Sequence, residues 1–239
     1  MGEFVAEETP SRESGRSRRR PEKRTGVGAV LREFVIVIGL SLIIATLVRI
    51  FLVQAFLIPS ASMMDTLIEG DRVLVSKLTT RFGEVERGDI VVFEDPNGWL
   101  PNVPVESDGF GGAVRDVLTF VGVLPEESHG HLIKRVVGIG GDTIVCCNDD
   151  GLIEVNGVAV DETPYLRPGN QPSLTEFEVE VPEGEFYVLG DYRSNSGDSR
   201  INGTVPDDAI VGRAFAIAWP FSRWDGLDDE GVFDDLPSE

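Results

Sequence analysis

Two serines, Ser60 and Ser62, lie two residues apart in the segment IPSASM, directly after a long apolar run. A serine hydroxyl attacks an amide carbonyl only when a neighbouring base removes its proton. Histidine is the usual base, but both histidines, His129 and His131, occur in ESHGHL, which we interpret as a solvated loop. Lysine is the alternative base, so the two serines raise the question of which lysine could serve them.

Two lysines follow the apolar run, Lys77 and Lys134. Lys77 ends the strand-like segment RVLVSK, where we expect its side chain to be exposed. Lys134 lies among apolar residues in HLIKRVVGI, and burial there would lower its pKa and leave a neutral amine that can accept a proton. Taken alone, this segment favours the simpler interpretation, in which the lysine points outward from an alternating strand.

A polar cluster, GDYRSNSGDSR, favours the catalytic interpretation, in which Lys134 points inward and acts as the base. It spans residues 190–200 and follows a predicted strand. Its aspartates can hold its arginines in bidentate ion pairs, and one of its serine hydroxyls can orient a lysine amine. The cluster therefore predicts a rigid polar turn that supports a Ser-Lys site. The residues available for the ion pairs are Asp191, Arg193, Asp198 and Arg200.

The residues before the serines predict a helix that spans a membrane. Phe34–Ala55 holds 22 residues with a single charge, Arg49. As a helix it would be about 33 Å long, which is enough to cross a bilayer. The basic run RSRRRPEKR precedes it and predicts a cytoplasmic N-terminus by the positive-inside rule. A cleaved signal peptide and a buried soluble helix are alternatives, disfavoured because the apolar run is long and lacks a charged face.

The formal net charge of −20 is unevenly distributed. The first 50 residues carry nine Lys/Arg and six Asp/Glu, whereas the rest carry 12 basic and 35 acidic residues, a net charge of −23. Such an acidic body repels phosphate backbones, which argues against nucleic-acid binding. Neither the histidines nor the adjacent Cys146 and Cys147 have metal-ligand spacing, so we expect no metal and no cofactor. Because neighbouring residues of a strand point to opposite faces, we expect one buried cysteine rather than a disulfide.

The sequence after the apolar run predicts a mainly β fold. Short β-branched segments are separated by Gly, Pro, Asn and Asp without intervening helices, which predicts an antiparallel folded sheet. The pattern EVNGVAV predicts a tight hairpin at Asn156 and Gly157. The predicted strands are residues 72–78, 89–95, 131–139, 142–147, 152–160, 177–190 and 209–219.

These patterns divide the chain into segments of different character. A basic cytoplasmic segment and an acidic tail are expected to be disordered, because both are polar and poor in core-forming residues. Between them we expect one membrane helix and an extracytoplasmic β domain that contains a small inserted β sub-domain. Residues 97–130 are expected to form an insertion packed on this domain. In chain order, the expected bounds are 1–32, 33–55, 56–223 with the sub-domain at about 146–185, and 224–239.

Five segments resemble, in the same order, those of bacterial type I signal peptidases, the membrane-anchored Ser-Lys proteases that remove signal peptides from exported proteins. The segments are the apolar anchor, IPSASM, GDRVLVSK followed by RGDIVVF, IKRVVGIGGD, and GDYRSNSGDSR. The resemblance extends from residue 34 to about residue 219. Each motif alone is a weak signal, but five of them in order after an anchor indicate the family.

The resemblance implies a role for each polar residue of the site. Ser62 matches the nucleophile and Lys134 the general base of an acyl-enzyme mechanism. Ser60 matches a serine whose hydroxyl forms part of the oxyanion hole, with the backbone N–H of Ser62 as the second donor. The supporting positions, a hydroxyl that orients the lysine and an ion pair that braces the site, are Ser196, Asp198 and Arg200.

The resemblance also implies the partners, which are secretory preproteins and the lipid bilayer. Two small apolar pockets would accept Ala-like side chains at the first and third residues before the cut, because a larger side chain would have to displace packed atoms. Tethering by the anchor would hold the site where the signal peptide emerges from the membrane. The residues expected to line the pockets are Phe56, Ile58, Met63, Leu67, Leu132 and Ile133.

Three residues depart from the pattern of this family. Asp65 and Gly140 stand where proline is frequent, and Tyr192 stands where asparagine is frequent. We expect Asp65 to face solvent, because a carboxylate facing the site would favour the charged form of the lysine. Two rival interpretations are a self-cleaving Ser-Lys protease of the repressor type and a non-catalytic, membrane-anchored β module. The membrane span and the lack of a DNA-binding domain disfavour the first.

Overall fold

The computed structural model describes residues 27–78, 83–96, 98–100, 130–227 and 231–237. Its first element is helix α1 (Val27–Phe51), whose apolar side chains are exposed over most of its length. Residues 28–48 of this helix are long and apolar enough to cross a membrane, and none of this span is buried within the protein. An apolar surface on all sides of a helix is stable in lipid rather than in water.

The end of the apolar run is a strand and not a helix. Strand β1 (Val53–Leu57) begins two residues after α1 and pairs with β2, so residues 53–55 leave the expected helix. Alternation explains the difference, because Gln54 and Phe56 are buried while their neighbours are half-buried. A continuous apolar run in the sequence hides this change of period from 3.6 to 2.

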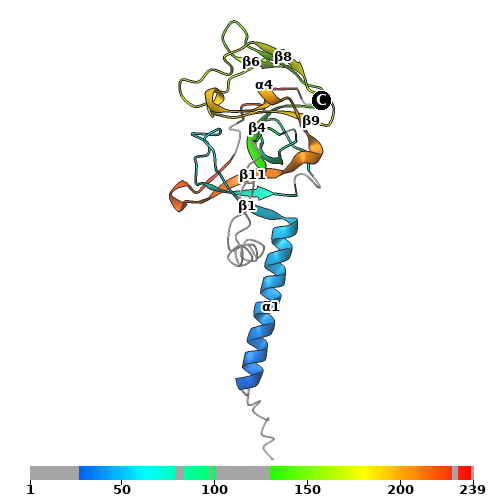
Figure 1. The fold of residues 1–239 in the computed structure, drawn as a ribbon, viewed down its shortest axis with the longest axis vertical. Helices are drawn as coiled ribbons and strands as arrows, with labels where there is room; N and C mark the ends of the chain where they lie inside the picture. The colour runs from blue at the N-terminus through cyan, green and yellow to red at the C-terminus, as the bar shows by residue number, and fades with distance from the viewer. Residues whose placement is uncertain (1–26, 79–82, 97, 101–129, 228–230, 238–239) are drawn as a thin grey trace, which may run out of the picture. The chain divides into compact units, whose positions relative to one another are not determined.

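The larger sheet carries the proposed site. Its strands are arranged in the order β1-β2-β11-β3-β4-β9-β10, with β12 paired to β11, and every pair is antiparallel (Figure 1). The mainly antiparallel β fold expected from the sequence is therefore confirmed. The strands are β1, β2 (Arg72–Ser76), β3 (Ile90–Glu94), β4 (His131–Ile139), β9 (Glu185–Leu189), β10 (Val205–Pro206), β11 (Ile210–Trp219) and β12 (Asp225–Gly226).

A smaller sheet of four strands is inserted between β4 and β9, in the order β7-β6-β5-β8. Its hairpin turns at Asn156 and Gly157, which have φ angles of 54° and 77°, and positive φ at both residues is the requirement of a type I′ turn. The strands are β5 (Thr143–Cys146), β6 (Ile153–Val155), β7 (Val158–Val160) and β8 (Phe177–Glu180), and the short helices elsewhere are η1 (Arg193–Asn195), α4 (Ser199–Asn202), η2 (Asp207–Ala209) and η3 (Phe221–Arg223).

One hydrophobic cluster joins the two sheets. It combines Val137 and Leu189 of the larger sheet with Ile144 and Val155 of the smaller one. Burial of apolar surface between the sheets therefore fixes the small sheet on the strands that carry the site. Residues 101–129, most of the insertion expected at 97–130, and residues 1–26 of the basic segment expected at 1–32 lie outside the described residues.

Two local expectations need correction. Part of the tail expected to be disordered is packed, because Phe233 and Leu236 are buried in the cluster between the sheets and Phe233 stacks on Tyr165. Cys146 is buried as expected, but its sulfur is bonded to that of Cys147. Strand β5 ends at Cys146, so the alternation that would separate the two side chains no longer applies at Cys147.

Candidate active site

Ser62 lies in the turn that follows β1. Backbone hydrogen bonds from Ile58 N to Asp71 O and from Gly70 N to Ile58 O, both 2.9 Å, hold the start of this turn. Its other end is anchored by two wholly buried apolar side chains, Met63 and Leu67. Ser62 itself is 8% exposed. The turn therefore presents one serine hydroxyl from a backbone that core packing holds in place.

Lys134 points inward from β4, and the outward-pointing interpretation is wrong. Its side chain is 3% exposed, and its Nζ donates to Ser62 Oγ at 2.7 Å and to the carbonyl of Ile133 at 2.9 Å. Burial lowers the pKa of Lys134 from its ordinary value to about 8, against the opposing charges of Asp198 and Asp191. A neutral amine has a lone pair, so the same contact can carry the hydroxyl proton from Ser62 to the lysine.

Two possible donors to a developing oxyanion lie beside Ser62 Oγ. Ser60 is exposed, and its Oγ lies 3.4 Å from Ser62 Oγ. The backbone N–H of Ser62 donates to no acceptor among the described residues. Groups of this kind stabilise the tetrahedral intermediate of acyl transfer when they point at the carbonyl oxygen.

The loop of residues 190–200 packs against the turn that carries Ser62, called the nucleophile turn after the role expected from the sequence. Asp198 and Arg200 form the expected bidentate ion pair, with Nη2–Oδ2 and Nε–Oδ1 distances of 2.8 Å. Ser196 Oγ is buried, but it makes no hydrogen bond among the described residues, so the expected bond to the lysine is not formed in this structure. A Cβ on Gly190 would lie 2.5 Å from Ser62 O and 2.7 Å from Ser196 Cβ, so glycine is needed for this close approach.

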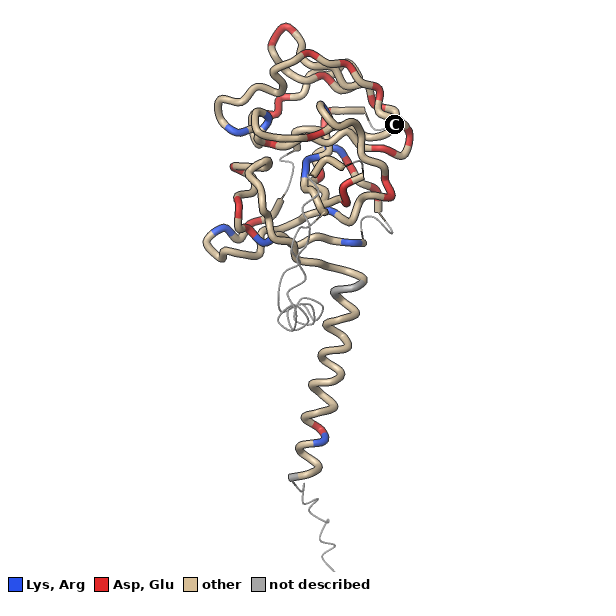
Figure 2. Tube along the Cα trace, viewed as in Figure 1, with Lys and Arg blue, Asp and Glu red and all other residues tan. Residues whose placement is uncertain are grey.

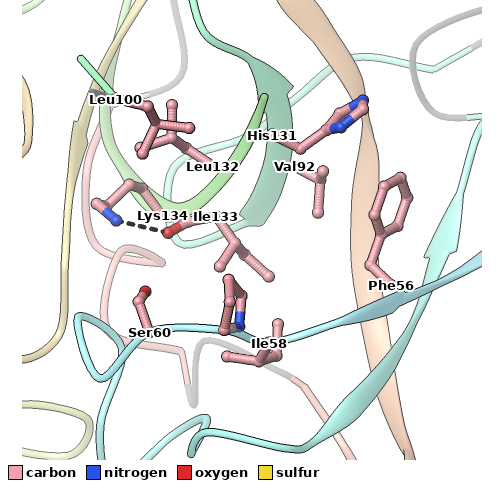
Figure 3. Close-up of a pocket in the computed structure, with 10 residues that line it drawn as sticks. Phe56, Ile58, Ser60, Val92, Leu100, His131, Leu132, Ile133 and Lys134 are labelled. Atoms are coloured by element: carbon pink, nitrogen blue, oxygen red, sulfur yellow. Dashed lines mark hydrogen bonds between the residues drawn. The ribbon is translucent and has the colours of Figure 1, made fainter. Parts of the chain in front are cut away.

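A small apolar cavity of about 100 Å³ is lined in part by Lys134 and Ser60 (Figure 3). Four of the expected pocket residues, Phe56, Ile58, Leu132 and Ile133, line it. The other two, Met63 and Leu67, are wholly buried in the same hydrophobic cluster and do not line the cavity. The remaining lining residues are Pro59, Ser60, Val92, Leu100, His131 and Lys134.

His131 was expected in a solvated loop, but it is the first residue of β4 and is half-buried. Its ring lies 5.3 Å from that of Phe56, between centroids, at the wall of the cavity (Figure 3). His129 lies outside the described residues. Asp65 is exposed as expected, and its φ of 82° is one that proline cannot adopt.

Comparison with known proteins gives the family. The family model described as "Signal peptidase, peptidase S26" matches residues 31–219. The chain belongs to this signal peptidase family. It is 38% identical to Signal peptidase I of Mycobacterium tuberculosis over 86% of this chain and 76% of that protein. It is 34% identical to Signal peptidase I of Leptolyngbya laminosa over 81% and 82%, and 33% identical to Signal peptidase I T of Bacillus subtilis over 78% and 84%.

Family membership and the apolar helix together define the broad activity. The chain is a serine peptidase, a hydrolase that removes signal peptides, and its substrates are therefore secretory preproteins. Helix α1 anchors it in a membrane. For a signal peptidase, the serine and lysine brought together by the turn after β1 and by β4 are the groups to test first.

Two buried ion pairs behind the site were missed by the sequence analysis. Arg135 binds Asp191 in a bidentate pair, with Nε–Oδ1 at 3.0 Å and Nη2–Oδ2 at 2.8 Å, and Thr66 Oγ1 donates to the same carboxylate at 2.6 Å. Arg193 pairs with Glu162 in the same way. Local spacing predicted ion pairs only within residues 190–200, whereas Arg135 and Asp191 are 56 positions apart. The only signal was the basic residue that follows Lys134.

Proposed function

We propose that Ser62 is the nucleophile and Lys134 the general base with which this signal peptidase cleaves the preprotein. One observation carries the proposal. A buried lysine amine lies 2.7 Å from a serine hydroxyl, next to a small apolar cavity. Lys77, the other lysine that the structure describes, follows β2 at a half-buried position rather than a buried one.

The chemistry follows from this contact. Ser62 Oγ attacks the carbonyl carbon of the scissile bond while Lys134 accepts the hydroxyl proton. The lysine then gives that proton to the leaving amine, the C–N bond breaks, and an ester to Ser62 remains. A water molecule attacks the ester, Lys134 takes its proton, and the proton returns to Ser62 Oγ as the signal peptide leaves. Ser60 Oγ and the N–H of Ser62 would stabilise the oxyanion in both steps.

Ser196 is assigned the third hydrogen bond to the charged lysine. An ammonium has three donors, and the structure uses two of them, to Ser62 Oγ and to the carbonyl of Ile133. Ser196 Oγ is a buried acceptor without a partner among the described residues, on the loop that packs against the nucleophile turn. Asp198 and Arg200 would brace this loop, since Asp198 also accepts a hydrogen bond from Gly190 N at 3.1 Å.

The apolar cavity would select small side chains before the cut. Its volume of about 100 Å³ and its walls of Phe56, Ile58, Leu132 and Ile133 support an Ala-like side chain at the first and third positions before the scissile bond. A larger side chain would have to move residues that pack in the core behind the cavity.

The orientation in the membrane is also proposed. The basic residues before α1 favour a cytoplasmic N-terminus and a catalytic domain on the other side. Ser62 follows Phe51, the last residue of α1, by 11 residues, which is at most about 36 Å of extended chain. This tether would keep the site near the bilayer surface. Digestion of the domain by protease added outside intact cells, with α1 protected, is the expected result.

Assay of the full-length protein in detergent with a secretory precursor tests the catalytic assignment. Ser62→Ala and Lys134→Ala should abolish cleavage, and Lys77→Ala should not, because Lys77 is the other lysine of the domain and serves as the matched control. Sequencing the new N-terminus should place the cut after a small residue. Equal cleavage by the parent and both site variants would reject the Ser62–Lys134 assignment and leave another group as the nucleophile.

A further inference from the structure

We propose that Arg167, held on the ring of Tyr192 beside the nucleophile turn, recognises a carboxylate in the first two residues after the cut. This inference rests on the proposed function of Ser62 and Lys134. It concerns a cation that lies outside the Ser-Lys pair, the ion pairs behind it and the apolar cavity.

Arg167 contacts two residues, Tyr192 and Met64, that lie beside Ser62. Tyr192 N donates to Ser62 O at 3.1 Å, which fixes Tyr192 against the nucleophile turn. The guanidinium of Arg167 lies over the Tyr192 ring, with its Cζ 4.5 Å from the ring centroid. Its Nη1 also contacts the sulfur of Met64, two residues after Ser62. None of these three side chains lines the apolar cavity.

The charge of Arg167 is not neutralised within the described part of the chain. Six arginines of the domain form ion pairs with carboxylates there, whereas Arg167 has none. This contrast is informative because residues 51–239 carry a net charge of −23, with acidic residues spread over both sheets and basic ones sparse (Figure 2). The six paired arginines are Arg87, Arg135, Arg193, Arg200, Arg213 and Arg223.

The chemistry of the site fits a carboxylate ligand. An arginine stacked on an aromatic face is pre-oriented, and its planar N–H groups can still bind a carboxylate in a bidentate fashion. If the residues before the cut occupy the apolar cavity, the chain after the cut must leave Ser62 on another side. Arg167 and Tyr192 adjoin the turn that carries Ser62 without lining the cavity, so an aspartate or glutamate at the first or second position would come within reach of the guanidinium. Arg167 is half-buried, so we expect the pair to favour an acidic substrate by about fivefold.

The test uses peptides that share one signal-peptide cleavage site and differ at one residue after the cut. Asp, Asn or Lys is placed at the first position and, in a second set, at the second position, and kcat/KM is measured with the full-length protein in detergent. The parent should cleave the Asp peptide about fivefold faster than the Asn peptide in at least one set. Arg167→Gln should remove this ratio, Arg167→Lys should keep part of it, and Arg167→Glu should favour the Lys peptide.

Arg72→Gln is the matched control. Arg72 also lies over an aromatic ring, 5.9 Å from the centroid of Trp219, and it has no carboxylate partner among the described residues. Its substitution changes the net charge by the same amount, so it should leave the Asp-to-Asn ratio unchanged. The ratio within one variant does not depend on how much of that variant is folded, so partial unfolding does not obscure the result.

The remaining outcomes separate the two proposals. Equal kcat/KM for Asp, Asn and Lys peptides in a parent that cleaves at one bond would overturn the role of Arg167 and leave the Ser-Lys proposal intact. A ratio that survives Arg167→Gln, or that Arg72→Gln also removes, would overturn it too, because the net field would then be the cause. Cleavage that persists in Ser62→Ala would instead overturn the proposed function.

Discussion

Strand β4 carries two buried cations side by side, and the protein surrounds them in opposite ways. Lys134 has a serine hydroxyl and a backbone carbonyl as its nearest partners, and no carboxylate in the described part of the chain bonds to it directly. Arg135, on the other face, is held by two oxygens of Asp191 and by the carbonyl of Gly88, and its guanidinium lies 4.1 Å from the ring centroid of Tyr165. Burial is nearly equal at the two positions.

The difference shows which cation is able to give up its charge. Burial lowers the pKa of both side chains, but at Arg135 the direct contact with Asp191 outweighs burial and raises the pKa. At Lys134 the aspartates act only from a distance, burial prevails, and the pKa falls to about 8. Arginine keeps its proton in any protein environment, so it braces the site, whereas the lysine can act as a base.

The largest effect should come from placing a permanent cation at the lysine position. Lys134→Arg keeps a positive charge but removes the base, so kcat should fall by about a thousandfold or more. The measurement is steady-state cleavage of a preprotein peptide, with Lys77→Arg as the control that should stay close to the parent. A Lys134→Arg variant with a tenth or more of the parent activity would show that the amine does not act as a base.

The second largest effect should come from breaking the pair on the other face. Arg135→Met leaves Asp191 buried without its partner, which should lower the free energy of unfolding by about 3–5 kcal/mol. Arg213→Met is the matched control, because its ion pair with Asp89 is 36% exposed on the arginine side and should cost about 1 kcal/mol or less. Denaturant unfolding of the full chain in detergent gives both values. Equal losses in the two variants would mean that burial of the Arg135 pair has no special weight.

Much of the larger sheet could be predicted because the pattern that indicates each strand lies within that strand and its flanking turns. Alternation and turn residues indicated the strands, and the order of five motifs indicated both the serine and the lysine. The direction of the Lys134 side chain could not be predicted in this way. Alternation within HLIKRVVGI assigns its residues to two faces of the strand, but it does not tell which face is buried by the rest of the protein. The turn that carries Ser62 determines which face is covered, and Ser62 and Lys134 are 72 positions apart in the chain.

The misses have the same cause. The partner of Arg135 is a loop residue that follows β9, and the partner of Arg193 lies in a loop 31 positions away, so no motif contains both members of either pair. Strand β1 was merged with the membrane helix because its pairing with β2 is a tertiary contact. Phe233 and Leu236 were assigned to a disordered tail because two apolar residues among acids bury surface only when another element covers them.

A smaller effect is expected at Ser196. The loop of residues 190–200 carries both Ser196, the proposed partner of Lys134, and Asp191, the partner of Arg135. Ser196→Ala removes the proposed third acceptor for the charged lysine, so kcat should fall at least about tenfold with little change in KM. Its stability should hardly change, because the hydroxyl makes no hydrogen bond among the described residues. Thr66→Val is the contrasting variant, since it removes a 2.6 Å bond to Asp191 and should cost about 1–2 kcal/mol of stability. A Ser196→Ala enzyme with unchanged kcat would show that two bonds suffice to hold the ammonium.

The smallest effect that distinguishes Lys134 from Arg135 is expected from a change of pH on the parent enzyme. If Lys134 must be neutral to accept the serine proton, kcat/KM should rise with pH and level off above the pKa of about 8, falling about tenfold for each unit below it. The same lowered pKa means that the folded protein binds fewer protons than the unfolded chain between about pH 8 and the ordinary lysine value, so stability should also rise across that interval. Lys134→Met should remove this rise in stability, whereas Arg135 should contribute nothing to it, because its raised pKa keeps it charged throughout. A pH profile that is flat between pH 6 and 9 would contradict the neutral amine, and the two cations of β4 would then differ in geometry alone.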